Sequence, residues 1–231
     1  MAGVLLAAGE GSRLGRPKAL VEFGGQSLAE RGVNLLRAGG ADPVLVVTGA
    51  APVRLDRIHT VHNDQWRTGM GSSLRAALRA LTAAELPAGT AAELPAGTGG
   101  EPDRTALPGC VGAVVVALAD QPLVGAGAVA RLIAAYRDGA SVVVAAYDGR
   151  PRNPVLLARE HWPEVIATAD GDQGARAFLR ARPELVTVIE CGDTGRPDDI
   201  DTAEDLARVT RLAGENADQA QAPWIVPEER T

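Results

Sequence analysis

A glycine-rich stretch that follows the first apolar run of the chain is the clearest candidate for chemistry. The apolar run ends at Leu6, and the next residues read AAGEGSRLGRPK, with three glycines, two arginines and a lysine. Exposed backbone amides in such a loop can approach phosphate closely, and arginine and lysine side chains supply cations for a polyphosphate. The stretch therefore predicts a phosphate-binding loop, with a basic surface turn as the alternative.

The spacing of the glycines excludes two familiar phosphate loops. A dinucleotide-binding loop has the pattern GxGxxG, opens directly into a helix and needs an acidic residue at the end of the next strand. Here the last glycine comes one position later, a proline interrupts the stretch, and the next apolar run ends without an acid. A Walker A loop needs Gly-Lys-Ser/Thr, whereas Arg16 follows the last glycine. We expect the amides of Gly9 and Gly11 and the side chains of Arg13 and Lys18 to contact phosphate.

Asp120 is the first of two candidate metal ligands. It follows the apolar run at residues 113–118, within the stretch ALADQP. Mg²⁺ prefers few protein carboxylates, retained waters and substrate phosphate oxygens, so one aspartate at the end of a buried strand suits this ion. The alternative is a turn residue that precedes Pro122.

Asp201 is the second candidate ligand, in the stretch DDIDTAEDL at residues 198–206. The alternative is structural, because Asp201 with Glu204, or Thr202 with Asp205, has the spacing of a capping box at the start of the last helix. Spacing alone leaves both interpretations open.

Two further stretches carry polar residues suited to ligand binding. In TGMGSSLRAAL, Gly69, Ser72 and Ser73 lead into a predicted helix, whose positive N-terminus can hold an anion or the edge of a base. The alternative is that Ser72 or Ser73 is an ordinary N-cap. In GRPRNPVLL, polar side chains form either the acceptor side of a cleft or a solvated turn; they are Arg150, Arg152 and Asn153.

Short apolar runs alternate with helical patterns along the chain, and these elements must position the candidate residues. The expected strands cover residues 3–7, 44–47, 58–61, 113–118, 142–146 and 185–189. The expected helices cover residues 27–38, 72–81, 127–136, 173–181 and 203–212. The alternation predicts an α/β fold, a single Rossmann-like doubly wound domain with a mostly parallel sheet and helices on both faces. Ligands bind such sheets outside the carboxyl ends of the strands, where the candidate residues lie.

The chain is expected to form one domain at residues 1–213, followed by a flexible tail at 214–231. A low-complexity loop insertion is expected at residues 83–109, because AAELPAGT occurs at 83–90 and again at 91–98. Such a tandem duplication is typical of a tolerated surface loop. The segment PWIV in the tail is a candidate for docking onto the body or a partner.

Composition excludes several functional classes. The net charge of −6 and the aromatic content of 3% argue against a nucleic-acid surface. Cys110 and Cys191 lack the spacing of a zinc site or a disulfide framework, and no histidine lies near a nucleophile in a hydrolase pattern. The apolar stretch at residues 4–8 is too short for the apolar core of a signal peptide, and no later stretch reaches membrane-spanning length, so we expect neither feature. We therefore expect a cytoplasmic protein that binds neither nucleic acid nor membranes.

Taken in order, these motifs resemble a family, the nucleotidyltransferases of molybdenum cofactor maturation, and within it the molybdenum cofactor cytidylyltransferases. The family loop LAAGxGxRxGxxK is matched at Leu6, Ala7, Ala8, Gly9, Gly11, Arg13, Gly15 and Lys18. Residues 69–75 match a Gly-Met-x-x-Ser-Leu-Arg helix start, and 199–206 match an Asp-Ile-Asp-Thr-x-Glu-Asp-Leu ending. An Asp-Gln-Pro turn and a Pro-Val-Leu segment lie between them, so the resemblance spans most of residues 3–212.

The resemblance implies a magnesium-dependent transfer of CMP from CTP to the terminal phosphate of molybdopterin, with release of pyrophosphate and with Mn²⁺ as an alternative metal. Arg13, Lys18 and Asp120 would be catalytic, and Asp120 and Asp201 would hold the metal. Ala8 favours CTP, because the guanylyl branch more often has a second glycine there. A molybdoenzyme or its chaperone is an implied partner. The nucleotide would contact Leu6, Ala7, Ala8, Gly9, Gly11, Lys18, Gly69, Ser72 and Ser73.

The sequence also departs from the family pattern. Ala119 replaces the glycine that usually precedes the aspartate of the Asp-Gln-Pro turn. Arg152 and Asn153 replace the Gly-His that commonly precedes the Pro-Val-Leu segment, and the duplicated loop has no counterpart. These departures keep two alternatives open. One is a guanylyl- or other NTP transferase acting on a sugar phosphate or another small phosphorylated metabolite, and the other is a non-catalytic nucleotide- or cofactor-binding partner.

Overall fold

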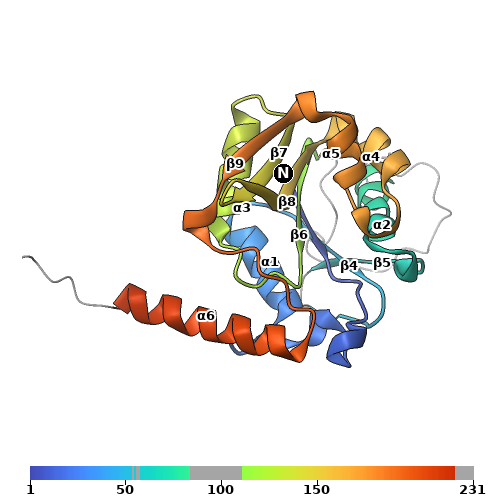
Figure 1. The fold of residues 1–231 in the computed structure, drawn as a ribbon. Coiled ribbons are helices and arrows are strands. Elements are labelled where there is room, and N and C mark those ends of the chain that lie inside the picture. Colours follow the sequence, from blue (N-terminus) through green and yellow to red (C-terminus); the bar gives the residue numbers. More distant parts are fainter. Residues whose placement is uncertain (54, 56–57, 84–110, 222–231) are drawn as a thin grey trace, which may run out of the picture.

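A seven-stranded sheet forms the centre of the molecule (Figure 1). The computed structural model describes residues 1–53, 55, 58–83 and 111–221, with the side chains of the last helix described up to residue 215. All strand pairs in this sheet are parallel except the two that β8 makes with β6 and β7, so the predicted α/β fold with a mostly parallel sheet is confirmed. In spatial order the strands are β5 (His59–His62), β4 (Val44–Thr48), β1 (Ala2–Leu6), β6 (Ala113–Leu118), β8 (Arg150–Ala158), β7 (Val142–Tyr147) and β9 (Val186–Glu190).

Strand β1 lies where the strand order reverses. From β1 the chain adds β4 and β5 on one side, and β6 and the remaining strands form the other side. Leu6 at the end of β1 pairs with Val47 of β4 and with Leu118 of β6. The loop after β1 and the turn after β6 therefore leave the same edge of the sheet side by side. This topological switch point is where open α/β sheets bind ligands.

Helices cover both faces of the sheet (Figure 1). Strand residues alternate between the two faces, so Leu5 and Val115 pack toward α1 and α3, whereas Val4 and Val116 pack toward α2, α4 and α5. Each continuously apolar strand thus contributes to two cores at once, as expected for a sheet buried on both sides. The helices on the two faces are α1 (Leu28–Ala38), α2 (Met70–Ala83), α3 (Ala126–Arg137), α4 (Trp162–Thr168) and α5 (Arg176–Ala181).

A separate apolar cluster joins a small hairpin to the last helix. The hairpin consists of β2 (Glu22–Phe23) and β3 (Gln26–Ser27), and the last helix is α6 (Ala203–Gln221). The fully buried members of this apolar cluster, which we call the hairpin cluster, are Val21, Leu28, Ile200 and Val209. This cluster holds the segment that contains Asp201 against the chain that follows the glycine-rich loop. The far end of α6 extends beyond the rest of the fold (Figure 1).

Strand β8 and helix α4 are not among the elements expected from sequence. Arg150, Arg152 and Asn153 lie in β8, so the solvated-turn interpretation of this stretch is wrong. Prolines at 151 and 154 disfavour a central strand, because each lacks an amide donor. The register of β8 against β7 shifts between Val144 and Ala145, and this β-bulge takes up residues 153–154. The bulge explains how a proline-containing segment fits inside the sheet.

Three helices differ from the sequence prediction by more than one residue at an end. Helix α2 begins at Met70, two residues before the expected start, so neither Ser72 nor Ser73 is its N-cap. Gly174 has a φ of +53°, and the predicted helix at 173–181 is reduced to α5. Helix α6 continues to Gln221, past the expected domain end at 213.

Some sequence expectations lie outside the described residues. They are the duplicated segment, the cysteine at 110 and PWIV at 223–226. Within the described part of the chain, Cys191 is a buried free thiol, and no helix is both long and apolar enough to cross a membrane.

Candidate active site

Lys18 lies at the centre of a charge cluster at the carboxyl edge of the sheet. Its Nζ donates to Asp120 Oδ2 at 2.7 Å and to Asp201 Oδ1 at 2.5 Å. Arg13, from the same loop as Lys18, contacts the other carboxylate oxygen of Asp201 at 3.1 Å. The structure thus brings together the four residues that the sequence analysis assigned to catalysis and metal binding, from three segments far apart in the chain.

Lys18 and Asp201 in this cluster each favour the charged form of the other. Burial disfavours the charged form of Lys18, but Asp120 and Asp201 outweigh this effect and raise the pKa of Lys18 above its ordinary 10.5. The hydrogen bond from Lys18 lowers the pKa of Asp201 below 3.8, against the effect of its partial burial. Asp199 differs, because burial, followed by the charge of Asp120, raises its pKa above 3.8. Lys18 is therefore held as a cation between carboxylates that can also attract a metal ion.

The glycine-rich loop turns back on itself through the short 3-10 turn Ser12–Leu14. Gly11 precedes this turn with a φ of +62°, and a Cβ there would lie 2.2 Å from the carbonyl oxygen of Arg16, so only glycine fits. By contrast, no atom lies within 4 Å of the position that a Cβ on Gly9 would occupy. The backbone at Gly9 is therefore open to a ligand.

Asp201 can face Lys18 because its neighbours make the helix cap. Thr202 Oγ1 accepts a hydrogen bond from the backbone N–H of Asp205 at 3.1 Å, and Asp205 Oδ2 accepts one from the backbone N–H of Thr202 at 3.0 Å. This reciprocal pair is a capping box. Of the two boxes that the spacing allowed, the structure therefore uses Thr202 with Asp205, and both carboxylate oxygens of Asp201 contact cations of the loop.

Gln121 is a positioning residue whose role the sequence analysis missed. Its side chain is 5% exposed, and its Nε2 donates to Asp199 Oδ1 at 2.9 Å. The backbone N–H of Ile200 donates to the carbonyl oxygen of Asp120 at 2.9 Å. Together these bonds fasten the turn after β6 to the segment before α6, so they fix the separation of Asp120 and Asp201. The Asp-Gln-Pro motif contained the signal, but the partner of the glutamine lies 78 residues away.

Asn63, also missed from sequence, orders the start of α2. Its Nδ2 donates to Ser72 Oγ at 2.8 Å and to Ser73 Oγ at 3.0 Å. The Ser72 hydroxyl can donate to the carbonyl oxygens of Gly69 and Gln65, at 2.8 and 2.9 Å. Both serines are 3% exposed. The Ser72 hydroxyl is thus engaged within the protein.

A cavity of about 230 Å³, which we call the loop cavity, opens between the glycine-rich loop and the start of α2. Asp120, Trp66 and Asp172 line it together with seven residues predicted to bind nucleotide. Gly11 and Ser72, which were also predicted to do so, are not in its lining. The seven are Leu6, Ala7, Ala8, Gly9, Lys18, Gly69 and Ser73.

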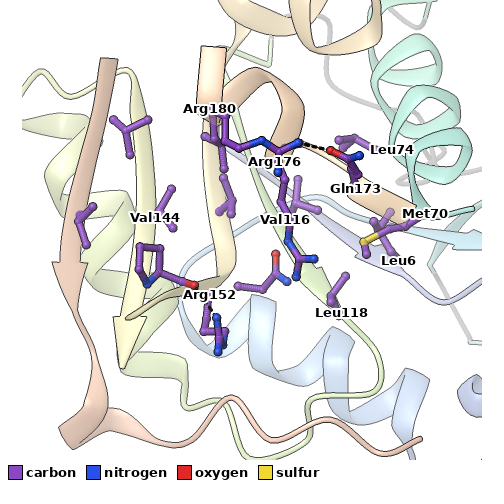
Figure 2. Close-up of a pocket in the computed structure, with 18 of the residues that line it drawn as sticks. Leu6, Met70, Leu74, Val116, Leu118, Val144, Arg152, Gln173, Arg176 and Arg180 are labelled. Atoms are coloured by element: carbon purple, nitrogen blue, oxygen red, sulfur yellow. Dashed lines mark hydrogen bonds between the residues drawn. The ribbon is translucent and has the colours of Figure 1, made fainter. Parts of the chain in front are cut away.

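A second cavity, of about 510 Å³, lies over the sheet on the side of α2 and α5, and we call it the sheet cavity (Figure 2). Arg152 and Asn153 of the predicted acceptor side line it, whereas Arg150 is exposed and lines neither cavity. Figure 2 shows Arg176 and Arg180 reaching into the same region from α5, with Arg180 donating to Gln173. The sequence analysis missed Gln173, Arg176 and Arg180, because α5 and the turn before it carry no recognisable motif.

The carboxylates at the charge cluster are suited to a small divalent cation. Asp120 and Asp201 each place an oxygen within hydrogen-bond distance of one nitrogen, so the two oxygens lie close together. In the part of the chain that the structure describes, no group of three or more His, Cys, Asp or Glu side chains could hold a metal. A cation here would complete its shell with waters and substrate phosphate, as Mg²⁺ commonly does.

Comparisons with known proteins place this site in a family context. Residues 3–186 match the model of the MobA-like NTP transferase domain. The chain is 35% identical over 221 residues to nicotine blue oxidoreductase of Paenarthrobacter nicotinovorans, covering 90% of this chain and 95% of the relative. It is 37% identical over 84 residues to a probable molybdenum cofactor guanylyltransferase of Opitutus terrae, covering 36% of this chain and 42% of that protein.

A solved structure agrees with this relationship. The homologue of Mycobacterium tuberculosis Rv0371c from Mycobacterium sp. strain JC1 superimposes with a TM-score of 0.69 at 29% identity, covering 93% of this chain and 97% of that one. The matched family model includes the glycine-rich loop, the start of α2, the turn after β6 and strand β8. The chain thus belongs to the MobA-like NTP transferase domain family, and its fold is that of a nucleotidyltransferase.

Proposed function

We propose that this nucleotidyltransferase transfers CMP from CTP to the terminal phosphate of a molybdopterin-type acceptor with the help of a divalent metal ion. The observation that carries the proposal is the convergence of Lys18, Asp120 and Asp201 beside the loop cavity. Transfer at an α-phosphate needs cations for the triphosphate and carboxylates for a metal, and this edge of the sheet offers both. The guanylyltransferase relative supports the acceptor class.

The reaction is an in-line displacement. An oxygen of the acceptor phosphate attacks the α-phosphorus of CTP, and a new P–O–P bond forms. The bond between the α-phosphorus and the oxygen that bridges to the β-phosphate breaks, and its electron pair leaves with pyrophosphate. Because the attacking phosphate is already anionic, the step needs positioning and charge neutralisation more than a protein base.

Residues of the loop would bind the triphosphate. The amides around Gly9 and Gly11 face the phosphates, and Lys18 and Arg13 neutralise their charge. Lys18 is only 21% exposed, so its charge acts in a partly water-excluded site, where it stabilises developing negative charge more than a surface lysine would. These assignments follow from the position of the loop at the switch point and from its open backbone at Gly9.

Mg²⁺, or Mn²⁺ in its place, would be held by Asp120 and Asp201. When bound, the metal supplies positive charge that draws electron density from the reacting phosphate. Lys18 now contacts the same two carboxylates. If Asp120 and Asp201 held the metal, the ammonium group of Lys18 would be available to the triphosphate, so the lysine and the aspartates would have complementary roles.

The proposed preference for CTP rests on Ala8, which stands where the guanylyl branch more often has a glycine. Ala8 and Trp66 both line the loop cavity, whose volume is about 230 Å³. The Ala8 methyl group narrows the cavity relative to a glycine at that position. A pyrimidine base needs less space than a purine, so this wall favours cytosine over guanine.

Pyrophosphate release tests the proposal directly. Purified protein is incubated with Mg²⁺, each of the four nucleoside triphosphates, and either molybdopterin cofactor or a sugar phosphate. We expect pyrophosphate only with CTP and the cofactor, and the Asp120→Asn variant should release none while it remains folded. Release with GTP, or with the sugar phosphate, would show that the base or the acceptor is misassigned. CTP binding without turnover in any combination would instead indicate a non-catalytic binding protein.

A second candidate is reduction of an apolar organic acceptor, since the relative from Paenarthrobacter nicotinovorans is named an oxidoreductase and the sheet cavity is mainly apolar. A reduced nicotinamide dinucleotide would donate hydride to the acceptor, and it would have to bind without the GxGxxG loop, which the glycine-rich stretch lacks. Incubation with nicotine blue and NADH or NADPH, followed by the absorbance of the reduced nicotinamide, measures this reaction. Acceptor-dependent oxidation without pyrophosphate release in the first assay would favour the second candidate.

A further inference from the structure

We propose that the sheet cavity binds the acceptor and selects a molecule that combines a flat apolar ring system with an anionic group. The inference rests on the proposed function, because it assigns the class of acceptor for that reaction. It is carried by the apolar floor of the cavity, by arginines at its rim that pair with no carboxylate of the described residues, and by lining residues that it shares with the loop cavity.

The floor of the sheet cavity is formed by apolar side chains of three strands, of which Val116 and Val144 are buried and Val188 is exposed. Val116 of β6, Val144 of β7 and Val188 of β9 line it, and Val188 is 48% exposed. An apolar concavity of about 510 Å³ is typical of small-molecule sites. This floor offers no hydrogen-bond partner, so the hydroxyl groups of a sugar would lose water without replacement. A ring system would instead be stabilised by contact with the valines.

Two arginines at the rim of the cavity can pair with an anion. Arg176 and Arg152 are exposed, and neither forms an ion pair with any carboxylate of the described residues. Figure 2 shows Arg176 extending from α5 among the lining side chains, whereas Arg180 is held by Gln173. A planar guanidinium group beside an apolar wall suits a carboxylate, sulfonate or phosphate attached to a ring, because it can bond the anion and stack on the ring.

The β-bulge in β8 helps to shape this site. Asn153 lies at the bulge, between the residues of β8 that pair with Val144 and Ala145 of β7, and it lines the sheet cavity. Bulges commonly redirect side chains beside functional sites. No hydrogen bond of the Asn153 side chain is found within the described residues, so its amide is free to donate to a ring heteroatom.

The sheet cavity adjoins the loop cavity. Leu6, Met70 and Leu118 line both. Leu6 and Leu118 are the paired ends of β1 and β6, immediately before the glycine-rich loop and the turn that carries Asp120. A molecule whose rings occupy the sheet cavity can therefore direct a phosphate toward the nucleotide site.

Two fluorescent probes separate the apolar and anionic requirements. The probe 1-anilinonaphthalene-8-sulfonate carries rings and an anion, and N-phenyl-1-naphthylamine carries the same rings without the anion. We expect saturable binding of both to the full chain. Arg176→Glu should raise the Kd of the sulfonate probe about tenfold with little change for the neutral probe, and Val188→Glu should weaken both. Arg137→Glu, an exposed site on the opposite face of the sheet, is the matched control and should change neither.

Competition then tests the acceptor class. We expect 1-naphthyl phosphate to displace the sulfonate probe and glycerol 3-phosphate to leave it bound. The inference is overturned if Arg176→Glu and Val188→Glu bind both probes like the unmodified chain, or if glycerol 3-phosphate competes equally well. Because probe binding needs no turnover, a failed pyrophosphate assay with intact probe results would reject the proposed function alone. Turnover with molybdopterin cofactor and no probe binding would reject the cavity assignment alone.

Discussion

At the scale of single residues, Lys18 is the group on which the candidate chemistry depends. It contacts Asp120 and Asp201 at once, so it is the counterion of both proposed metal ligands, and it lines the loop cavity. We expect Lys18→Met, which keeps the apolar stem and removes the charge, to lower kcat by about 10²–10³, the range for loss of one preorganised charged donor. Steady-state pyrophosphate release measures this effect.

The matched control for Lys18 is Arg16→Met in the same loop. Arg16 is exposed, and none of the ion pairs found among the described residues involves it. We expect that variant to keep kcat within about twofold, because a solvated charge contributes little. Equal kcat values in the two variants would return Lys18 to the status of an ordinary loop residue.

The two serines at the start of α2 should differ in effect. The Ser72 hydroxyl is engaged by Asn63, Gly69 and Gln65, whereas Ser73 also lines the loop cavity. We therefore expect Ser72→Ala to lower the free energy of unfolding by about 1–3 kcal/mol, because it leaves buried polar groups unpaired, with little change in KM for CTP. Ser73→Ala should raise KM. Denaturant unfolding and initial rates measure both, and a raised KM in Ser72→Ala alone would contradict the assignment.

The sequence allowed part of this site to be predicted. Asp120 and the loop could be located because each directly follows an apolar run of strand length, and the ends of parallel strands meet at one edge. The roles of Gln121 and Asn63 could not be predicted from the sequence. These roles depend on the direction in which each buried side-chain amide points. The Gln121 bond spans 78 residues, and its partner, Asp199, has nothing in its local pattern to distinguish it from the neighbouring aspartates.

At the scale of elements, Asp198 fastens the start of α6 to the segment that carries Asp201. It pairs with Arg196 at 3.0 Å and with Arg208 of α6. Burial opposes the charged form of Asp198, but the hydrogen bonds from both arginines outweigh it and lower its pKa below the ordinary 3.8. A carboxylate whose pKa is lowered by folding stabilises the fold above its unfolded pKa, and this contribution is lost as pH falls through the lowered value.

Unfolding at several pH values tests this connection. We expect Asp198→Asn to reduce the free energy of unfolding by about 1 kcal/mol at pH 7, since the arginines are partly solvent-screened. The difference from the unmodified chain should shrink as pH falls below 3.8, where the carboxylate is protonated first in the unfolded state. It should vanish only once pH is below the lowered pKa of Asp198 in the folded state. Asp138→Asn, at the exposed end of α3, is the control. A deficit in Asp198→Asn that does not change with pH would mean that packing rather than charge connects these segments.

Elements were predictable where one pattern dominated. The run at 113–118 coincides with β6, because six consecutive apolar residues that are rich in valine and bounded by turn signals favour a buried strand. Strand β8 was not predictable, since its two prolines argue against a central strand unless a bulge is known. The helix predicted at 173–181 was too long, since α5 begins only at Arg176. The helical pattern does not reveal that Gly174 has a positive φ, which a helix does not allow.

At the scale of the whole molecule, the reversal of strand order about β1 places the loop cavity and the charge cluster together. One crossover brings β4 to one side of β1, and the later chain brings β6 to the other. The alternation of elements predicted a doubly wound sheet with the candidate residues at its carboxyl edge, but not the order of its strands. The sheet cavity could not be predicted, because it depends on where the helices on one face lie, and helix positions across a sheet are not encoded in a local pattern.

The last helix tests where this domain ends. Val209 is a fully buried member of the hairpin cluster. Ala213 is the last residue along the chain that packs against this cluster, among the residues whose side chains are described. We expect a chain of residues 1–213 to unfold in one cooperative transition, with a Tm and a CTP affinity like those of the full chain, because the contacts that hold Asp201 are retained. Val209→Ala should cost about 2 kcal/mol of unfolding free energy. Loss of CTP binding in the truncated chain, measured by calorimetry, would show that residues beyond 213 belong to the domain and support its nucleotide site.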